Sequence, residues 1–247
     1  TGNSSTQAIT GVGFAPDFTW IKARDNGSNN HALTDSVRGT GSGNGLSSNT
    51  TGAEGQYSAA YGYLSAFGTD GFTVQAGSTS PNFVNSSSAN YVAWNWKAGG
   101  AAVSNTDGTV TSQVSANVDA GFSIVKWIGD GNASARVGHG ISKPDMIITK
   151  SLTDINDWNV NHVGIPNEII YLQSTNAAFS GGGTNGAFGY QSTNTSTTFG
   201  FTGGSSGVNN VNKLNSNYIA YCFHSVDGFS KMGSYTGTGA TGNTIVT

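Results

Sequence analysis

Charge is scarce in this 247-residue chain: charged residues make up 9% of it, against roughly a quarter in an average globular protein. The 10 Lys and Arg residues are scattered singly, and the formal net charge is -3. Such a chain offers no basic surface for a phosphate backbone. No run approaches the roughly 18 consecutive apolar residues that a membrane-spanning helix needs. We therefore expect neither nucleic-acid binding nor membrane insertion.

Cysteine and proline are also rare, with 1 Cys and 4 Pro. The single cysteine, Cys222, excludes an internal disulfide framework and a zinc site built from several cysteines. The lack of proline and charge, together with 11% aromatic residues, argues against a disordered chain. Glycine is abundant instead, with 37 residues, and Ser, Thr and Asn accompany it. This composition favours a folded, turn-dense all-β protein with hydroxyl and amide groups on its surface.

The chain repeats itself over long distances. A run from Pro16 to Lys22 recurs 128 positions later, from Pro144 to Lys150, and keeps its Pro-Asp start and its final Lys. A second run, residues 90–96, recurs as residues 217–223. Periods this long exceed those of solenoid repeats. We therefore expect each copy to be a domain-sized unit with its own core.

Within the second run, large apolar side chains occupy every other position, which is typical of a β-strand. The same positions are apolar in both copies, so we interpret their side chains as core: Val92, Trp94, Trp96, Ile219, Tyr221 and Phe223. Helical periodicity with caps is hard to find. The predicted fold class is all-β, with two tandem antiparallel β-sandwich modules of jelly-roll or lectin-like kind that are related by the internal repeat.

A third match predicts the module boundaries. The run Gly121-Phe122-Ser123 recurs as residues 228–230, only 107 positions later, so about 20 extra residues lie between the copies. These residues include an Asp-Gly turn flanked by Val and Thr, which is a hairpin signal. We expect module 1 at residues 1–100, a linker or added hairpin at 101–120, module 2 at 121–235, and the start of a possible third copy at 236–247. The chain would then be a window on a longer protein.

Patterns for catalysis and metal binding are weak. Residues 203–207 match the G-x-S-x-G nucleophile elbow, but that motif needs a strand-to-helix turn in an α/β sheet. Residues 237–242 spell G-x-G-x-x-G, yet a strand-like run follows instead of a helix. Asp154 and Asp157 share a turn that could offer oxygens to calcium, but they do not fit the twelve-residue calcium loop. We predict no enzymatic activity, no cofactor and no metal site.

Aromatic side chains among Asn, Ser, Thr and Gly form adaptable polar binding surfaces, including surfaces that bind sugars. Trp158 stands in a turn-rich run, residues 156–159, where a core role and a contact role remain open. Arg38 belongs to residues 35–39, a run that the second copy lacks. As speculative contacts for a glycan or a protein we name Trp158, Asp157, Asn159 and Arg38.

Several motifs recur in order over nearly the whole chain: GFAPDFTWIK, DSVRG, YVAWNWKAGG, GFSIVKWIGDGNASARVGHGISKPDMIITK and YIAYCFHSVDGFSKMGSYTGTG. They resemble a tandem domain of unknown function that is seen in tail-fibre and other structural proteins of marine tailed bacteriophages, cyanophages among them. The resemblance implies a virion protein on the particle surface, assembled with other virion proteins.

On this resemblance we expect part of a tail fibre or receptor-binding appendage that contacts host cell-surface glycan or protein. Similar phage appendages are commonly trimeric, so a homo-oligomer, most simply a trimer, is expected. A capsid fibre or decoration protein is one alternative. The other is a tailspike-type polysaccharide depolymerase, which would need a pair of carboxylates in a groove.

Overall fold

The computed structural model describes residues 1–55, 59–79, 83–180, 187–188, 191–202, 208, 210–242 and 244–245. These residues form strands joined by turns, with three short 3-10 helices: η1 (Ser42–Asn44), η2 (Ala59–Tyr61) and η3 (Gln191–Thr193). Every strand pair is antiparallel, so the predicted all-β sandwich class is confirmed. No helix in this part of the chain is long and apolar enough to cross a membrane. The elbow-like run 203–207 lies outside the described residues.

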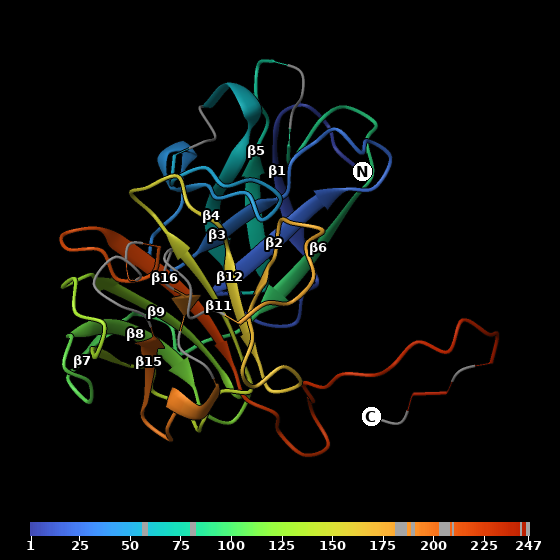
Figure 1. Ribbon diagram of the computed structural model, residues 1–247. Coiled ribbons are helices and arrows are strands. Elements are labelled where there is room, and N and C mark those ends of the chain that lie inside the picture. The colour runs from blue at the N-terminus through green and yellow to red at the C-terminus, as the bar shows by residue number, and fades with distance from the viewer. Residues whose placement is uncertain are drawn as a thin grey trace.

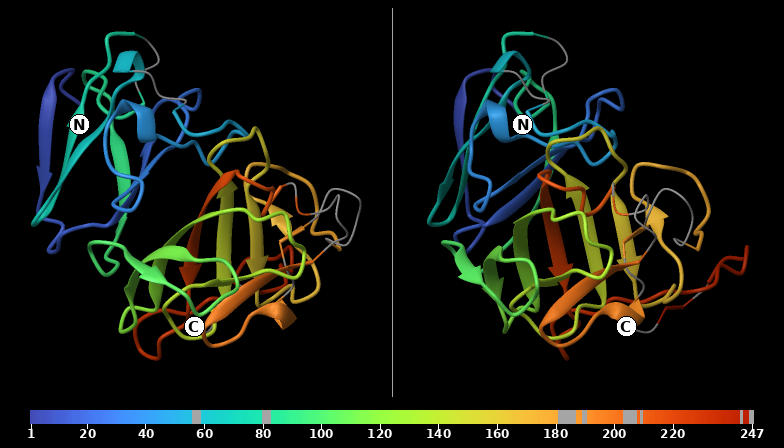
Figure 2. Two further views of the ribbon diagram at one scale, coloured as in Figure 1. Left: turned by 90° about the vertical axis from the view of Figure 1, so that its left-hand side faces the viewer. Right: turned by 60° about the vertical axis from the view of Figure 1, so that its left-hand side comes forward.

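Four antiparallel sheets are stacked face to face, and we call them sheets A to D (Figure 1, Figure 2). Sheet A contains β1 (Thr6–Thr10), β5 (Gly71–Gln75) and β4 (Tyr63–Gly68). Sheet B contains β3 (Ala32–Asp35), β2 (Phe18–Ala23) and β6 (Tyr91–Trp96). Sheet C contains β13 (Ile170–Tyr171), β12 (Asn159–His162), β11 (Met146–Ser151), β16 (Asn217–Phe223), β9 (Phe122–Ile128), β8 (Ser112–Asn117) and β7 (Val103–Asn105). Sheet D contains β10 (Arg136–Gly138), β15 (Thr198–Thr202) and β14 (Ala187–Phe188).

Three apolar cores fill the spaces between these sheets. Sheets A and B, which we call module 1, enclose one outer core, and sheets C and D, module 2, enclose another. A central core lies between sheets B and C and takes residues from both modules. β9 shows why alternation suits a strand inside this stack: Phe122 and Ile124 face the central core, while Val125 and Trp127 face the outer core of module 2. Each module thus has a core of its own, and the two modules share a third.

The strand pairing of module 1 is repeated in module 2. In the β2/β6 pair Phe18 lies opposite Trp96, and in the β11/β16 pair Met146 lies opposite Phe223. In the two repeated sequence runs, Phe18 matches Met146 and Trp96 matches Phe223. The internal repeat therefore extends from the sequence to the register of the sheets.

Residues 101–120, expected to form a linker or an added hairpin, contain β7 and β8, which pair with each other and extend sheet C beyond β9. The described part of segment 236–247, which is 236–242 and 244–245, contains no strand. The end of the chain runs away from the four sheets (Figure 1).

One core prediction is wrong. The side chain of Trp94 is 46% exposed, because it stands on β6 at the end of sheet B. Trp96 is half-buried and stacks on Phe18, with ring centroids 5.0 Å apart. Alternation identifies which side chains share a face of a strand, but it does not say how far that face is covered.

Candidate functional site

Arg38 lies in the turn that follows β3, and Asp35 shapes this turn. The Oδ1 atom of Asp35 accepts hydrogen bonds from the backbone N–H groups of Val37 (3.1 Å) and Arg38 (2.9 Å). Such local bonds from an Asp side chain to the backbone are typical of turns. They bring the guanidinium group of Arg38 back against the Asp35 carboxylate.

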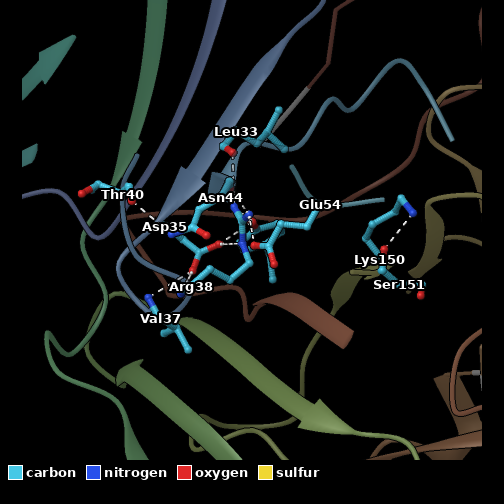
Figure 3. Close-up of polar contacts among 10 residues, drawn as sticks. Leu33, Asp35, Val37, Arg38, Thr40, Asn44, Glu54, Lys150 and Ser151 are labelled. Atoms are coloured by element: carbon cyan, nitrogen blue, oxygen red, sulfur yellow. Dashed lines mark hydrogen bonds and ion pairs between the residues drawn. The ribbon is translucent and has the colours of Figure 1, made fainter. Parts of the chain in front are cut away.

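The guanidinium group of Arg38 is fully enclosed between the modules and has a partner for each nitrogen (Figure 3). Its Nε lies 2.5 Å from Asp35 Oδ2, and its Nη1 lies 3.0 Å from Glu54 Oε1. The remaining contacts are to the backbone oxygens of Asn44 and Leu33 and to the hydroxyl oxygen of Tyr221. Because Tyr221 belongs to β16, this cluster connects module 1 to sheet C.

Burial and neighbouring charges shift the pKa values of Arg38 and Tyr221 in this cluster. Burial alone would lower the pKa of Arg38, but Asp35, the Tyr221 oxygen and Glu54 outweigh it and raise that pKa. Burial raises the pKa of Tyr221 well above its ordinary value, and its hydroxyl donates to Asp35 Oδ2 over 2.8 Å. Neither group changes its protonation near neutral pH, so the cluster acts as an ionic clamp.

Trp158 is fully buried, and its indole ring belongs to the central core. Its Nε1–H donates to the backbone oxygens of Ser47 (2.8 Å) and Thr50 (3.2 Å) in module 1. A buried indole N–H needs such an acceptor. Trp158 therefore fastens the start of β12 to a loop of module 1, and its ring reaches a ligand only if the modules separate.

The neighbours of Trp158 are also held internally. Asp157 Oδ1 accepts a hydrogen bond of 2.6 Å from Gln173 Nε2. Asn159 is buried, and its Nδ2 donates to the backbone oxygen of Asp157 over 3.1 Å. The structure thus brings Trp158, Asp157 and Asn159 together and places Arg38 in a separate cluster. Contact of these four residues with a glycan or a protein stays a prediction.

Lys150 is the penultimate residue of β11, and its side chain is buried (Figure 3). Its Nζ donates to the backbone oxygens of Ser151 (2.8 Å) and Asp154 (3.3 Å). Burial lowers its pKa to about 8, although Asp157 and Asp154 act in the opposite direction. Its counterpart in module 1, Lys22, likewise donates to a turn carbonyl, that of Asn26, over 3.0 Å. In both modules the final Lys of the repeated run thus stabilises the turn that follows it by hydrogen bonds to backbone oxygens.

Three loops at one end of module 2 present exposed aliphatic side chains, and we call them the end-loop surface: residues 128–132, 153–156 and 212–216. Hydrogen bonds join the loops, including Gly129 N to Ser216 O (2.8 Å) and Lys213 Nζ to Asp154 Oδ1 (2.6 Å). The exposed fractions are 75% for Ile155, 61% for Leu214 and 58% for Ile128. The loops are therefore fixed from within while their apolar side chains face solvent.

Asp154 is the centre of this arrangement. Its Oδ2 accepts a hydrogen bond of 2.6 Å from Ser216 Oγ, and its Oδ1 pairs with Lys213. Burial opposes the charge of Asp154, but the hydrogen bonds from Lys213 and Ser216 hold its pKa below the ordinary value. Sequence reasoning missed the end-loop surface. A single aliphatic residue within a polar turn, as at Ile155 and Leu214, is the signal that could have found it.

Within the described ranges, no group of three or more His, Cys, Asp or Glu side chains is arranged to hold a metal ion. Two carboxylates, those of Asp35 and Glu54, both pair with Arg38. Their oxygens serve the clamp, since Asp35 also accepts from Tyr221 and from its own turn.

The fold and its internal contacts define an all-β protein made of stacked antiparallel sheets. A family model described as Domain of unknown function (DUF7483) matches residues 1–247, and the chain belongs to this family. No curated protein matches the chain. No solved structure matches it either.

Proposed function

We propose that this chain is a non-catalytic structural protein of a bacteriophage virion, most directly part of a tail fibre or receptor-binding appendage at the particle surface. The observation that carries the proposal is the end-loop surface, where a stack of sheets presents exposed aliphatic side chains on fixed loops. Exposed apolar groups with polar surroundings are typical of interaction sites. The resemblance of the repeated motifs to phage tail-fibre proteins supports the same function.

The chemistry of this surface suits a glycan or a protein on the host cell. Ile155 and Leu214 offer apolar contact, and the loops around them carry Asn, Ser and Asp side chains for hydrogen bonds. Because hydrogen bonds already hold these loops in place, little conformational entropy is lost on binding. The ion pair of Arg38 and Asp35, which also contacts Tyr221 of module 2, helps to keep the modules together while the end-loop surface carries the contact.

A binding experiment with matched variants tests this proposal. The fluorescently labelled chain is added to a panel of marine cyanobacterial strains, and bound label is measured by flow cytometry. We expect the double variant Ile155→Ser/Leu214→Ser to lose binding at least about tenfold. The control Val103→Ser/Val118→Ser changes two side chains that are 65% and 59% exposed outside the end-loop surface, and it should bind normally. Equal loss in both variants, or binding retained in the first, contradicts the assignment of this surface.

The location of the protein separates the proposal from its alternatives. Gold-labelled antibodies against the chain should decorate the tail of the virion, and the free chain should compete with infection. Label on the capsid would favour a capsid fibre or decoration protein. Release of oligosaccharides from host polysaccharide by the purified chain would favour a depolymerase. The molar mass in solution tests the proposed trimer.

A further inference from the structure

An exposed turn of module 1 contains an asparagine followed by a glycine, Asn26-Gly27. The turn follows β2, and a hydrogen bond of 3.3 Å from Asn29 N to Asn26 O closes it. Because glycine has no Cβ atom, its backbone nitrogen can approach the side chain of the residue before it. The side-chain amide of Asn26 is therefore open to attack by the backbone nitrogen of Gly27.

Two hydrogen bonds in this turn act on the oxygens that gain negative charge in such an attack. Ser28 N donates to Asn26 Oδ1 over 3.0 Å, and this oxygen becomes the oxyanion when the amide carbon is attacked. Lys22 Nζ donates to Asn26 O over 3.0 Å. When Gly27 N loses its proton, the negative charge is shared with Asn26 O, so the Lys22 ammonium group stabilises it. The turn thus stabilises both the nucleophile and the tetrahedral intermediate.

The ammonium group of Lys22 is fixed in place, whereas the group that would leave is not. Lys22 Nζ donates a second hydrogen bond to Asn29 O over 2.9 Å, which holds it against the turn. Within the ranges that the structure describes, no acceptor takes a hydrogen bond from Asn26 Nδ2. The loss of this nitrogen as ammonia therefore breaks no contact of the folded chain.

Another Asn-Gly pair, Asn44-Gly45, provides a comparison within the same molecule. Asn44 Nδ2 donates to Thr40 O over 3.0 Å, and Asn44 O accepts a hydrogen bond from Arg38 in the clamp. Gly45 is buried. Reaction at Asn44 would therefore break a hydrogen bond inside a packed turn, which reaction at Asn26 does not.

The internal repeat shows that the turn accommodates a carboxylate. Residue 154 lies 128 positions after residue 26, and it is an aspartate. Lys150 Nζ donates to Asp154 O over 3.3 Å, as Lys22 Nζ donates to Asn26 O. An aspartate at residue 26 would therefore give module 1 the arrangement that module 2 already has.

We propose that Asn26 is a site of spontaneous deamidation, which the folded turn promotes. Gly27 N gives its proton to water and attacks Asn26 Cγ, and the new N–C bond closes a succinimide ring. The Cγ–Nδ2 bond breaks, and Nδ2 takes up a proton and leaves as ammonia. A water molecule then opens the ring at one of its two carbonyls, and the carboxylic acid gives its proton to ammonia. The net change is from an amide and water to a carboxylate and ammonium.

Ring opening has two products, and the turn suits both. Opening at Cγ gives aspartate, with the backbone unchanged. Opening at the backbone carbonyl gives isoaspartate, in which the chain runs through Cβ and Cγ and the former backbone carbonyl becomes the free carboxylate. That carboxylate includes the oxygen that Lys22 binds, so an ion pair replaces a hydrogen bond to a neutral group. This inference does not depend on the proposed host binding.

The rates at the two Asn-Gly pairs test the site. The purified chain is incubated at neutral pH, and its peptides are analysed by mass spectrometry with electron-transfer fragmentation, which separates isoaspartate from aspartate. In the folded protein Asn26 should convert at least about tenfold faster than Asn44, with both products present. In guanidinium chloride the two rates should become similar, because the fold no longer distinguishes them. Similar rates in the folded protein, or aspartate without isoaspartate at residue 26, would overturn the proposal.

A substitution of the attacking residue tests the ring closure. Gly27→Ala adds a Cβ atom that meets nothing within 4 Å, so the fold should be retained. The added atom hinders the approach of the backbone nitrogen, and conversion at Asn26 should slow at least about tenfold. The control Gly43→Ala also adds a Cβ atom in open space and should leave the rate at Asn26 unchanged. An equal rate in Gly27→Ala and the control would exclude the succinimide route.

Two variants of Lys22 separate its charge from its effect on the shape of the turn. Lys22→Met removes the ammonium group and should slow conversion at Asn26 several-fold, whereas Lys22→Arg keeps a cation and should restore most of the rate. A merely looser turn would let Gly27 N reach the amide more easily and would raise the rate. An unchanged or higher rate in Lys22→Met would therefore overturn the role of the ammonium group.

Discussion

Replacing Arg38 with Met should lower the free energy of unfolding by about 3 kcal/mol. Removing one partner from a buried ion pair costs about 3–5 kcal/mol, because the other charge stays buried without compensation. Asp35 keeps three other donors after the change, namely the Tyr221 hydroxyl and two turn amides, so the lower end of that range applies. The Glu54 side chain is 25% exposed, and water can replace its share of the contact.

For a chain of this length, 1 kcal/mol corresponds to about 2–4 °C in Tm. The Arg38→Met variant should therefore melt about 6–12 °C lower than the unmodified protein in differential scanning calorimetry. Arg24→Met is the matched control, because Arg24 is exposed, and it should melt within about 1 °C of the unmodified protein.

The double variant Asp35→Asn/Arg38→Met tests the reason for this loss. Once the Asp35 carboxylate is replaced by an amide, no fully buried charge remains unpaired in the clamp, because the remaining carboxylate, that of Glu54, is 25% exposed. The double variant should therefore be more stable than the sum of the two single changes indicates. Two results would refute the argument that a buried charge drives the effect. One is that the stability changes of the two single variants add up to that of the double variant, and the other is that the Tm of Arg38→Met falls by less than about 2 °C.

Three further changes have defined outcomes. Burial lowers the pKa of His139 to about 4. Below pH 6.5 the unfolded chain therefore binds more protons than the folded chain. As the pH falls from 6.5 to 4, up to about 3 kcal/mol of the free energy of unfolding should be lost. Urea unfolding at pH 7 and pH 4.5 should show a smaller pH dependence for His139→Gln than for the unmodified protein. Trp158→Phe keeps an aromatic ring but leaves the Ser47 and Thr50 oxygens without their indole donor, and the urea midpoint should fall by the equivalent of about 1–3 kcal/mol; an unchanged midpoint would show that water replaces the donor. Gly99→Ala puts a Cβ atom 2.4 Å from the Ala116 oxygen and should lower the Tm by several degrees, whereas Gly43→Ala meets open space and should leave it unchanged.

The sequence was sufficient to predict the repeated strands. Residues 16–22 and 90–96 carry strand signals of their own, and their recurrence at nearly constant spacing indicated that both copies contain the same strands. These are local patterns, and β2, β6, β11 and β16 follow them. The packing of sheet B against sheet C could not be predicted from the sequence, because no local sequence pattern indicates which two sheets pack together.

The contacts around the candidate residues depend on partners far along the chain. Trp158 meets Ser47, and Arg38 meets Tyr221, across separations of 111 and 183 residues. Spacing within a motif carries no information about such pairs. The prediction that Trp94 is buried was wrong for the same reason. The face of β6 that carries Trp94 was identified correctly, but the sequence does not show that β6 is the last strand of its sheet and leaves this side chain exposed.

The shared central core also has a consequence for how genes of this family can exchange parts. Phe18 and Leu33 of module 1 pack in one core with Phe122, Trp158 and Tyr221 of module 2. A recombination event that replaced one module alone would leave half of that core against a surface to which it had not adapted. The unit that can move between genes without loss of stability is therefore the pair of modules.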